Sequence, residues 1–352
     1  IPVLVSHNWG DWNVKQEEAW NLFRALENSP KKVLYMGTRW ENHGTPGGDY
    51  AKHVEMWMDH YLKGLDNGID RLPSVVSQTS DYEGALGFKK GMPKTKPVEL
   101  IAQESFTDDK YNWKLLPTEP VFFPGAPIGV AEFPSGGINT ESHMNHHSRN
   151  KHDWFWFETP MLKRDVRIFG TPKVELWSTI YRTWISLTPV LVDVDPSAHL
   201  AVGNNHTTYC DPNAIQAGDT NQCTEPVVGV TRGFLDSRYR NGLHKEVEVT
   251  PGKSFDSTIV MKPQDYVFRK GHIIGLQIAT EILEWHVPKA PAPCAAPDPN
   301  DPDQCATFRI DWTEGQTRLL LPIVDAPRDL GDLFDLMHQH DDECVLVPPV
   351  CP

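Results

Sequence analysis

Ile1-Pro2-Val3-Leu4-Val5-Ser6-His7-Asn8-Trp9-Gly10-Asp11 opens the chain and decides how the fold is interpreted. The apolar run Val3 to Val5 is short and mostly β-branched, as is typical of a buried parallel strand. Gly10-Asp11 then ends the run with a turn signal. A helix-compatible stretch over 15–28 follows, with apolar residues spaced along one face. This order of strand, turn and helix predicts an α/β unit.

A second apolar strand, 33–37, leads directly to Trp40-Glu41-Asn42-His43-Gly44. Asp11 and His43 therefore each follow a predicted parallel strand, at the sheet edge where active sites of open α/β folds lie. The triad of α/β-hydrolases runs in the chain order Ser, Asp or Glu, then His. Taken singly, a helix-capping Asp and a loop His without a role would be the simpler interpretation. Together and in this order, Asp11 and His43 are predicted to be the catalytic acid and base of such a triad.

The nucleophilic serine of that triad is missing, because the chain contains no Gly-x-Ser-x-Gly sequence. The nearest approach, Phe133-Pro134-Ser135-Gly136-Gly137, lacks the first glycine. In addition, two parallel strands with their helices cannot cover both faces of a sheet. We therefore expect an upstream polypeptide to carry the serine and the remaining strands.

Four segments are predicted along the chain. Residues 1–66 form the C-terminal part of an α/β-hydrolase catalytic domain, and 67–155 form a connecting segment rich in Pro, Gly and Lys. Residues 156–326 form a β-sandwich jelly-roll domain, because many short strands follow one another without helices. An acidic tail occupies 327–352. The strands expected in the jelly roll are 166–169, 174–177, 185–194, 227–235, 245–249, 257–261, 272–279 and 318–321.

Composition and charge exclude several classes of protein. The 352 residues carry a formal net charge of −14, which argues against nucleic acid and against an anionic membrane as partners. No apolar run approaches the roughly 18 residues that a membrane span needs. No cofactor motif stands out. The totals favour a water-soluble protein with two cores of ordinary size.

The six cysteines fall into three local pairs, and each pair brackets a polar or Pro-rich loop. Disulfides in these loops would restrain otherwise loose segments and would place the protein in an oxidising compartment. We therefore expect a secreted protein; the alternative is reduced thiols in a cytosolic one. The pairs are Cys210 with Cys223, Cys294 with Cys305, and Cys344 with Cys351.

Two clusters have the residue types of a metal site. His143, His146, His147 and His152 lie in one polar stretch, and an acidic loop spans 298–303. Solvated loops are the preferred interpretation of both. In the acidic loop, prolines disturb the ligand spacing that a calcium loop requires. The cysteine spacings are also unlike those of zinc sites. No metal is expected.

Several segments resemble the X-prolyl dipeptidyl peptidases and the related cocaine esterases and α-amino-acid ester hydrolases. The loop at 10–14 is similar to the acid-bearing loop of the peptidases, 40–44 to their His loop, and 57–64 to the helix that follows. Residues 165–172, 231–234 and 268–272 resemble marker segments of their C-terminal jelly roll. These landmarks occur in family order over nearly the whole chain, and Asp11-Trp12-Asn13-Val14 points to the peptidases in particular.

The resemblance implies a serine hydrolase in which Asp11 and His43 complete a triad whose serine and oxyanion-hole groups precede residue 1. Our leading hypothesis is the C-terminal part of a secreted serine peptidase that acts through an acyl-enzyme. Its substrate would be a peptide with Pro at the second position, released as an Xaa-Pro dipeptide. Trp9, Trp12 and Trp40 would line the pocket, with buried packing as the alternative for each.

Two other functions stay open. One is an acyl ester hydrolase on the same scaffold. The other is a non-catalytic module whose jelly roll binds a glycan or a cell-wall polymer. A homo-oligomeric state is left open as well.

Overall fold

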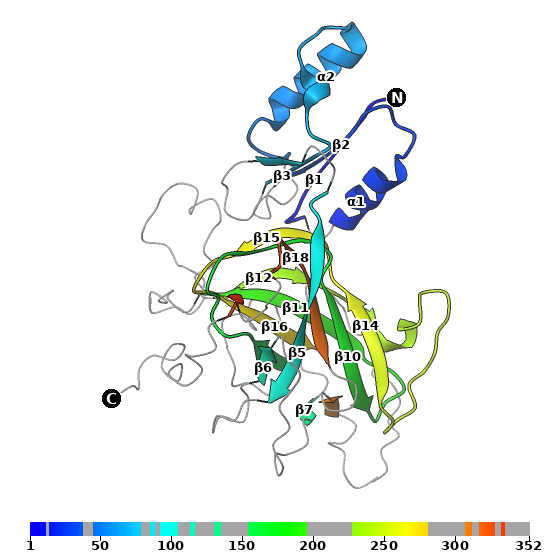
Figure 1. Cartoon of the computed structure of the whole chain (residues 1–352). Coiled ribbons are helices and arrows are strands. Elements are labelled where there is room, and N and C mark those ends of the chain that lie inside the picture. Colours follow the sequence, from blue (N-terminus) through cyan, green and yellow to red (C-terminus); the bar gives the residue numbers. More distant parts are fainter. Residues whose placement is uncertain are drawn as a thin grey trace, which may run out of the picture.

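The computed structural model describes residues 1–11, 14–37, 45–78, 85–88, 92–104, 113–116, 130–134, 154–195, 227–280, 307–311, 317–327 and 332–334. Within these residues the strands form one sheet of four strands and one of 14. Figure 1 shows the small sheet and its helices at one end of the large sheet, next to β15 and β18. The helices of the described residues include none that is long and apolar enough to span a membrane.

The small sheet has the order β1-β2-β3-β4. β1 pairs with β2 and β2 with β3 in parallel, while β4 runs antiparallel to β3. The alternation of strand and helix over 1–66 is as predicted, whereas β3 and β4 were not expected. The elements are β1 (Val3–Asn8), α1 (Gln16–Ala25), β2 (Lys32–Gly37), α2 (Tyr50–Lys63), the 3₁₀ helix η1 (Ile69–Arg71), β3 (Val75–Gln78) and β4 (Ala85–Phe88).

The burial of these elements follows from their places in the sheet. β2 lies between two parallel partners and is almost wholly buried, whereas β1 is only half-buried. α1 buries Trp20 and Phe23 and ends at Ala25, three residues before the predicted end. α2 ends at Lys63, and the following Gly64 adopts φ 71° and so forms a left-handed C-cap that a side chain would strain.

The large sheet is antiparallel except where β6 pairs in parallel with β8. Its strands are β5 (Thr95–Glu104), β6 (Trp113–Leu116), β7 (Val130–Pro134), β8 (Trp154–Glu158), β9 (Val166–Gly170), β10 (Lys173–Ile180), β11 (Ser186–Val194), β12 (Val227–Arg232), β13 (Leu235–Asp236), β14 (Phe255–Val260), β15 (Gln264–Phe268), β16 (Ile273–Ala279), β17 (Thr307–Asp311) and β18 (Arg318–Val324), with the 3₁₀ helix η2 (Ser237–Tyr239) after β13. The described part of 156–326 is thus β-rich, as predicted.

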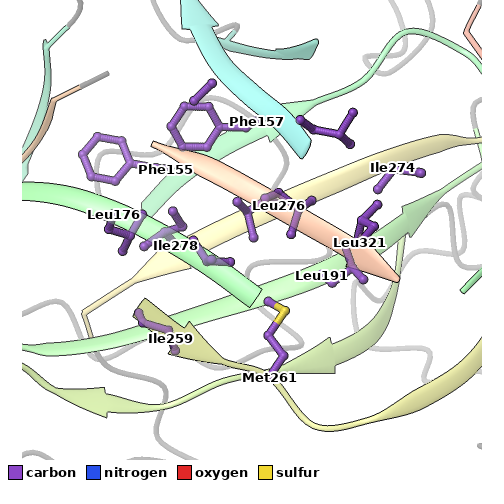
Figure 2. Packing of buried hydrophobic residues seen from close by; sticks show 14 of the residues in the cluster. Phe155, Phe157, Leu176, Leu191, Ile259, Met261, Ile274, Leu276, Ile278 and Leu321 are labelled. Atoms are coloured by element: carbon purple, nitrogen blue, oxygen red, sulfur yellow. The ribbon is translucent and has the colours of Figure 1, made fainter. Parts of the chain in front are cut away.

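The largest apolar cluster of the described residues lies within the large sheet. Leu276 and Ile278 of β16 and Leu191 of β11 lie in the same buried cluster as Leu321 of β18 and Leu176 of β10. Figure 2 shows β18 crossing in front of β11 and β16, with these side chains between the strands. Burial of this many aliphatic and aromatic side chains, each contributing about 1.5–3 kcal/mol, is the main source of stability of this part of the chain.

The segment predicted to connect the domains is part of both sheets. β3 and β4 join the small sheet, and β5 to β8 join the large one. β5 pairs with β18 from Thr95↔Val324 to Ile101↔Arg318. The prolines that suggested a connection do not interrupt this pairing, because Pro97 stands opposite Pro322 and neither needs to donate a main-chain hydrogen bond.

One predicted strand is wrong. Residues 245–249 have the alternating pattern of a strand but belong to no sheet. The Val247 N–H donates to Arg238 O, and the Val249 N–H donates to Thr183 O. These two N–H groups therefore donate to two different parts of the chain, and no continuous strand pairing forms.

Candidate active site

Asp11 lies at the carboxyl end of β1, as predicted. The Trp9 N–H donates to Gly37 O at 3.2 Å, and the Asp11 N–H donates to Asn8 O at 3.3 Å, which closes a turn after the strand. Asp11 is only 7% exposed. Its Oδ1 accepts from the Val14 N–H at 3.3 Å. The turn therefore holds a nearly buried carboxylate beyond the sheet edge.

His43, Trp12 and Trp40 lie outside the described residues. The segment that carries His43 leaves the sheet at Gly37, the last residue of β2. Gly37 is the register partner of Asn8, the last residue of β1. Because β1 and β2 run in parallel, the chain segments toward Asp11 and His43 start from the same edge of the small sheet. This is the arrangement that the sequence predicts for a paired acid and base.

Trp9 is fully buried and packs in the interior. Its ring centroid lies 6.2 Å from that of Trp20 in α1 and 6.1 Å from that of Phe169 in β9. Its indole N–H donates to Ser77 Oγ at 2.9 Å. A side chain with no exposed surface offers nothing to a substrate, so Trp9 is a packing residue in this structure, contrary to its predicted place in the pocket lining.

Beneath Trp9 lies a buried polar network that the sequence did not reveal. The Ser77 hydroxyl donates to Asp265 Oδ2 at 2.6 Å. Asp265, whose side chain is 0% exposed, also accepts from Arg167 at 2.7 Å (Nε to Oδ1) and 2.6 Å (Nη2 to Oδ2). The only sequence signals were an aspartate directly before a short apolar run and an arginine in a predicted strand. Neither indicates a partner about a hundred residues away in the chain.

Further contacts join the Asp11 loop and the start of α1 to the large sheet. Gln16 of α1 and Gln264 of β15 both donate their side-chain amide N–H groups to Trp9 O, at 3.2 and 2.8 Å. Glu17 of α1 forms an ion pair with Lys262, just before β15. These bonds tie the start of α1 and the residue two positions before Asp11 to one end of β15.

A second titratable cluster lies on the large sheet. His272 Nδ1 is 2.9 Å from Asp193 Oδ1, and its Nε2 is 3.8 Å from Asp195 Oδ2. The Tyr266 hydroxyl donates to Asp193 Oδ2 at 2.7 Å. The hydrogen bond with Asp193 raises the pKa of His272, and burial partly opposes this rise.

No group of three or more His, Cys, Asp and Glu side chains that could hold a metal occurs in the described part of the chain. The four clustered histidines, the acidic loop over 298–303 and all six predicted disulfide cysteines lie outside it. Those predictions stay predictions.

Solved structures of hydrolases share this fold. An aminopeptidase from a marine sediment Thaumarchaeota archaeon superposes with a TM-score of 0.67 and 18% identity, over 92% of this chain and 55% of its own. An α-amino acid ester hydrolase superposes with a TM-score of 0.64 and 17% identity, over 92% of this chain and 55% of its own. A CocE/NonD family hydrolase from Staphylococcus aureus gives 0.60 and 15%, over 92% and 54%. This chain therefore has the same fold as the matching part of these three structures.

The family follows from the sequence. The profile of the X-Pro dipeptidyl-peptidase C-terminal non-catalytic domain matches residues 67–313, more than half of the chain. The chain belongs to this family, as its resemblance to the X-prolyl dipeptidyl peptidases implies. Asp11 and His43 lie before the matched residues, outside the domain described as non-catalytic.

Curated relatives of this chain are named as Xaa-Pro dipeptidyl-peptidases. A putative Xaa-Pro dipeptidyl-peptidase from Bacillus anthracis is 26% identical over 82% of this chain and 42% of its own length. One from Streptomyces avermitilis is 28% identical, over 79% and 42%. The chain spans less than half the length of these relatives.

Proposed function

We propose that this chain is the C-terminal part of a secreted serine peptidase that removes Xaa-Pro dipeptides from peptide N-termini. Residues 1–66 would complete an α/β-hydrolase domain, and the large sheet would be its jelly roll. The observation that carries the proposal is the buried carboxylate of Asp11 at the end of β1, beside the end of β2 from which the chain leads to His43. Membership of the dipeptidyl-peptidase family supports the substrate class.

In this mechanism Asp11 would hold the His43 imidazole in one tautomer and stabilise its protonated form. His43 would take the proton of the serine hydroxyl as the oxygen attacks the carbonyl carbon of the proline residue. It would then return the proton to the leaving amine, which breaks the peptide bond. Water would hydrolyse the acyl-enzyme by the reverse sequence of proton transfers.

An upstream polypeptide would supply the serine and its oxyanion hole. β1 supports this part of the proposal, because within the described residues it pairs on one side only, with β2. An additional parallel strand could pair with its other edge. The greater length of the curated relatives is consistent with such a segment.

The proposed location rests on the cysteines. Three local pairs around polar loops suit disulfides, and disulfides persist in oxidising compartments. Thiol counting by mass spectrometry, with and without reduction, tests this part. Six reactive thiols in the unreduced, unfolded protein would contradict it.

The substrate is tested by comparing Gly-Pro-anilide with a simple aryl ester, using the protein expressed from its complete coding sequence. A peptidase prefers the anilide with proline at the second position and loses activity toward Gly-Gly-anilide. A preference for the ester would favour the second candidate, an acyl ester hydrolase. That candidate is supported by the structural likeness to the α-amino acid ester hydrolase.

A further inference from the structure

We propose that the large sheet positions the catalytic acid loop, with Gln264 and Asp265 of β15 and Ser77 of β3 as positioning residues for Asp11. This inference rests on the proposed function and deepens it. The family's C-terminal domain would then take part in catalysis indirectly, by fixing the main chain that presents the triad carboxylate.

Every polar group of Trp9 has a fixed partner. The main-chain N–H donates to Gly37 O at the end of β2. The main-chain carbonyl accepts from Gln16 and Gln264, and the indole N–H donates to Ser77 Oγ. Because only Gly10 separates Trp9 from Asp11, anchoring Trp9 restricts where the Asp11 carboxylate can lie.

The direction of the hydrogen bonds is also fixed. A hydroxyl has one proton to donate, and Ser77 gives it to Asp265 at 2.6 Å. Its lone pairs are then free to accept from the Trp9 indole. Asp265 is fully buried and is held by two bonds from Arg167, so the acceptor at the end of this chain of bonds cannot rotate away.

The apolar contacts reinforce the polar ones. Phe169 lies two residues after Arg167 in β9, and its ring meets both Trp9 and Trp20. β9 pairs with β15, with Asp265 opposite Phe169 in register. Two adjacent strands of the large sheet thus supply the ring that packs on Trp9 and the carboxylate that anchors it. Figure 1 shows β15 along the end of the large sheet that faces the small one.

The test measures kcat and KM for Ser77→Ala and Gln264→Met in the protein expressed from its complete coding sequence. A misplacement of about 1 Å at a catalytic group can cost up to about 100-fold in rate, so we expect kcat to fall at least about tenfold with KM nearly unchanged. The matched control is Tyr266→Phe, which also removes a buried hydrogen bond in β15, the one to Asp193. Its kcat should equal that of the unchanged protein.

A double-mutant cycle separates positioning from general destabilisation. If Ser77 acts through Asp11, Ser77→Ala should lower kcat no further when Asp11→Asn is already present. An equal fall in both backgrounds, an unchanged kcat for both positioning variants, or an equal fall in Tyr266→Phe would overturn the inference. All assays are run well below each variant's melting temperature.

Failure of the proposed function gives a different result. Both proposals would be overturned if the unchanged protein hydrolysed neither the anilide nor the ester. They would also be overturned if the Asp11→Asn variant kept full activity. An active protein that depends on Asp11 but tolerates Ser77→Ala and Gln264→Met would overturn the positioning role alone.

Discussion

Arg167 and Asp265 form a two-contact ion pair between β9 and β15, with donor–acceptor distances of 2.7 and 2.6 Å. The Asp265 side chain is 0% exposed and that of Arg167 is 18% exposed. A buried carboxylate is tolerated only when it is paired and hydrogen-bonded; here the guanidinium supplies the opposite charge and the Ser77 hydroxyl a further hydrogen bond. The pair therefore stabilises the end of the large sheet on which the Asp11 loop rests.

Removing the cation should destabilise the protein strongly. Arg167→Met leaves the Asp265 carboxylate buried with its guanidinium gone, and breaking a buried pair in this way costs about 3–5 kcal/mol. The measurement is the free energy of unfolding in urea. Arg269→Met is the matched control, because its pair with Asp165 is 2.8 Å long but solvent-exposed, and should cost under about 1 kcal/mol. Equal losses in the two variants would show that burial does not matter here.

The His272 cluster should make stability depend on pH. The hydrogen bond with Asp193, aided by the charge of Asp195 and opposed by burial and by Arg269, raises the pKa of His272 in the folded state. The Tyr266 hydroxyl also faces Asp193. Protonated His272 therefore stabilises the fold fully below its unfolded pKa of about 6.5, and this contribution is lost as the pH rises through the higher folded value.

The pH effect is measured as the difference in unfolding free energy between the unchanged protein and His272→Gln. The difference should be largest below about pH 6 and should shrink on the alkaline side of pH 6.5. A difference that grows with pH would mean that His272 is held neutral. NMR titration of the imidazole provides an independent reading of the folded pKa.

Gly275 of β16 should not tolerate a side chain. A Cβ atom there would lie 2.5 Å from Val192 Cγ2 in the neighbouring strand β11. Gly275→Ala should therefore cost about 1–3 kcal/mol of unfolding free energy through overpacking. Val192→Ala should relieve the clash, so the double variant should be more stable than the two separate losses predict. Additive losses would place the strain elsewhere.

Asp11→Asn should lower kcat by about 10⁴ with the fold intact, because an amide no longer holds the histidine in the required tautomer. The checks are steady-state kinetics and a thermal melt. Asp49→Asn, which changes an exposed aspartate directly before α2, is the control and should leave kcat unchanged. Retained activity in Asp11→Asn would show that Asp11 has no catalytic role and serves only in the turn.

The elements that could be predicted from the sequence are those that depend on residues close together along the chain. β1, β2 and α1 follow from apolar runs and helical spacing, because these features are local. β15 was missed, since its first residues, Gln264 and Asp265, are polar yet buried. Their burial depends on partners in the loop after β1, in β3 and in β9 that no local pattern indicates.

The same limit applies to the candidate site. The order of Asp11 and His43 after two strands could be predicted, because the position of a loop at a sheet edge follows from strand direction. The burial of Trp9 could not, since it depends on Phe169, 160 residues further along the chain. The polar contacts that connect the two sheets could not be predicted either, because they also join residues far apart in the sequence.

The most direct test of the central claim is fluorophosphonate labelling of the native preparation, followed by identification of the labelled peptide by mass spectrometry. The proposal predicts one labelled serine in polypeptide upstream of Ile1, with labelling abolished or strongly slowed by Asp11→Asn. An absence of label in the whole preparation, or label on a serine within residues 1–352, would contradict it.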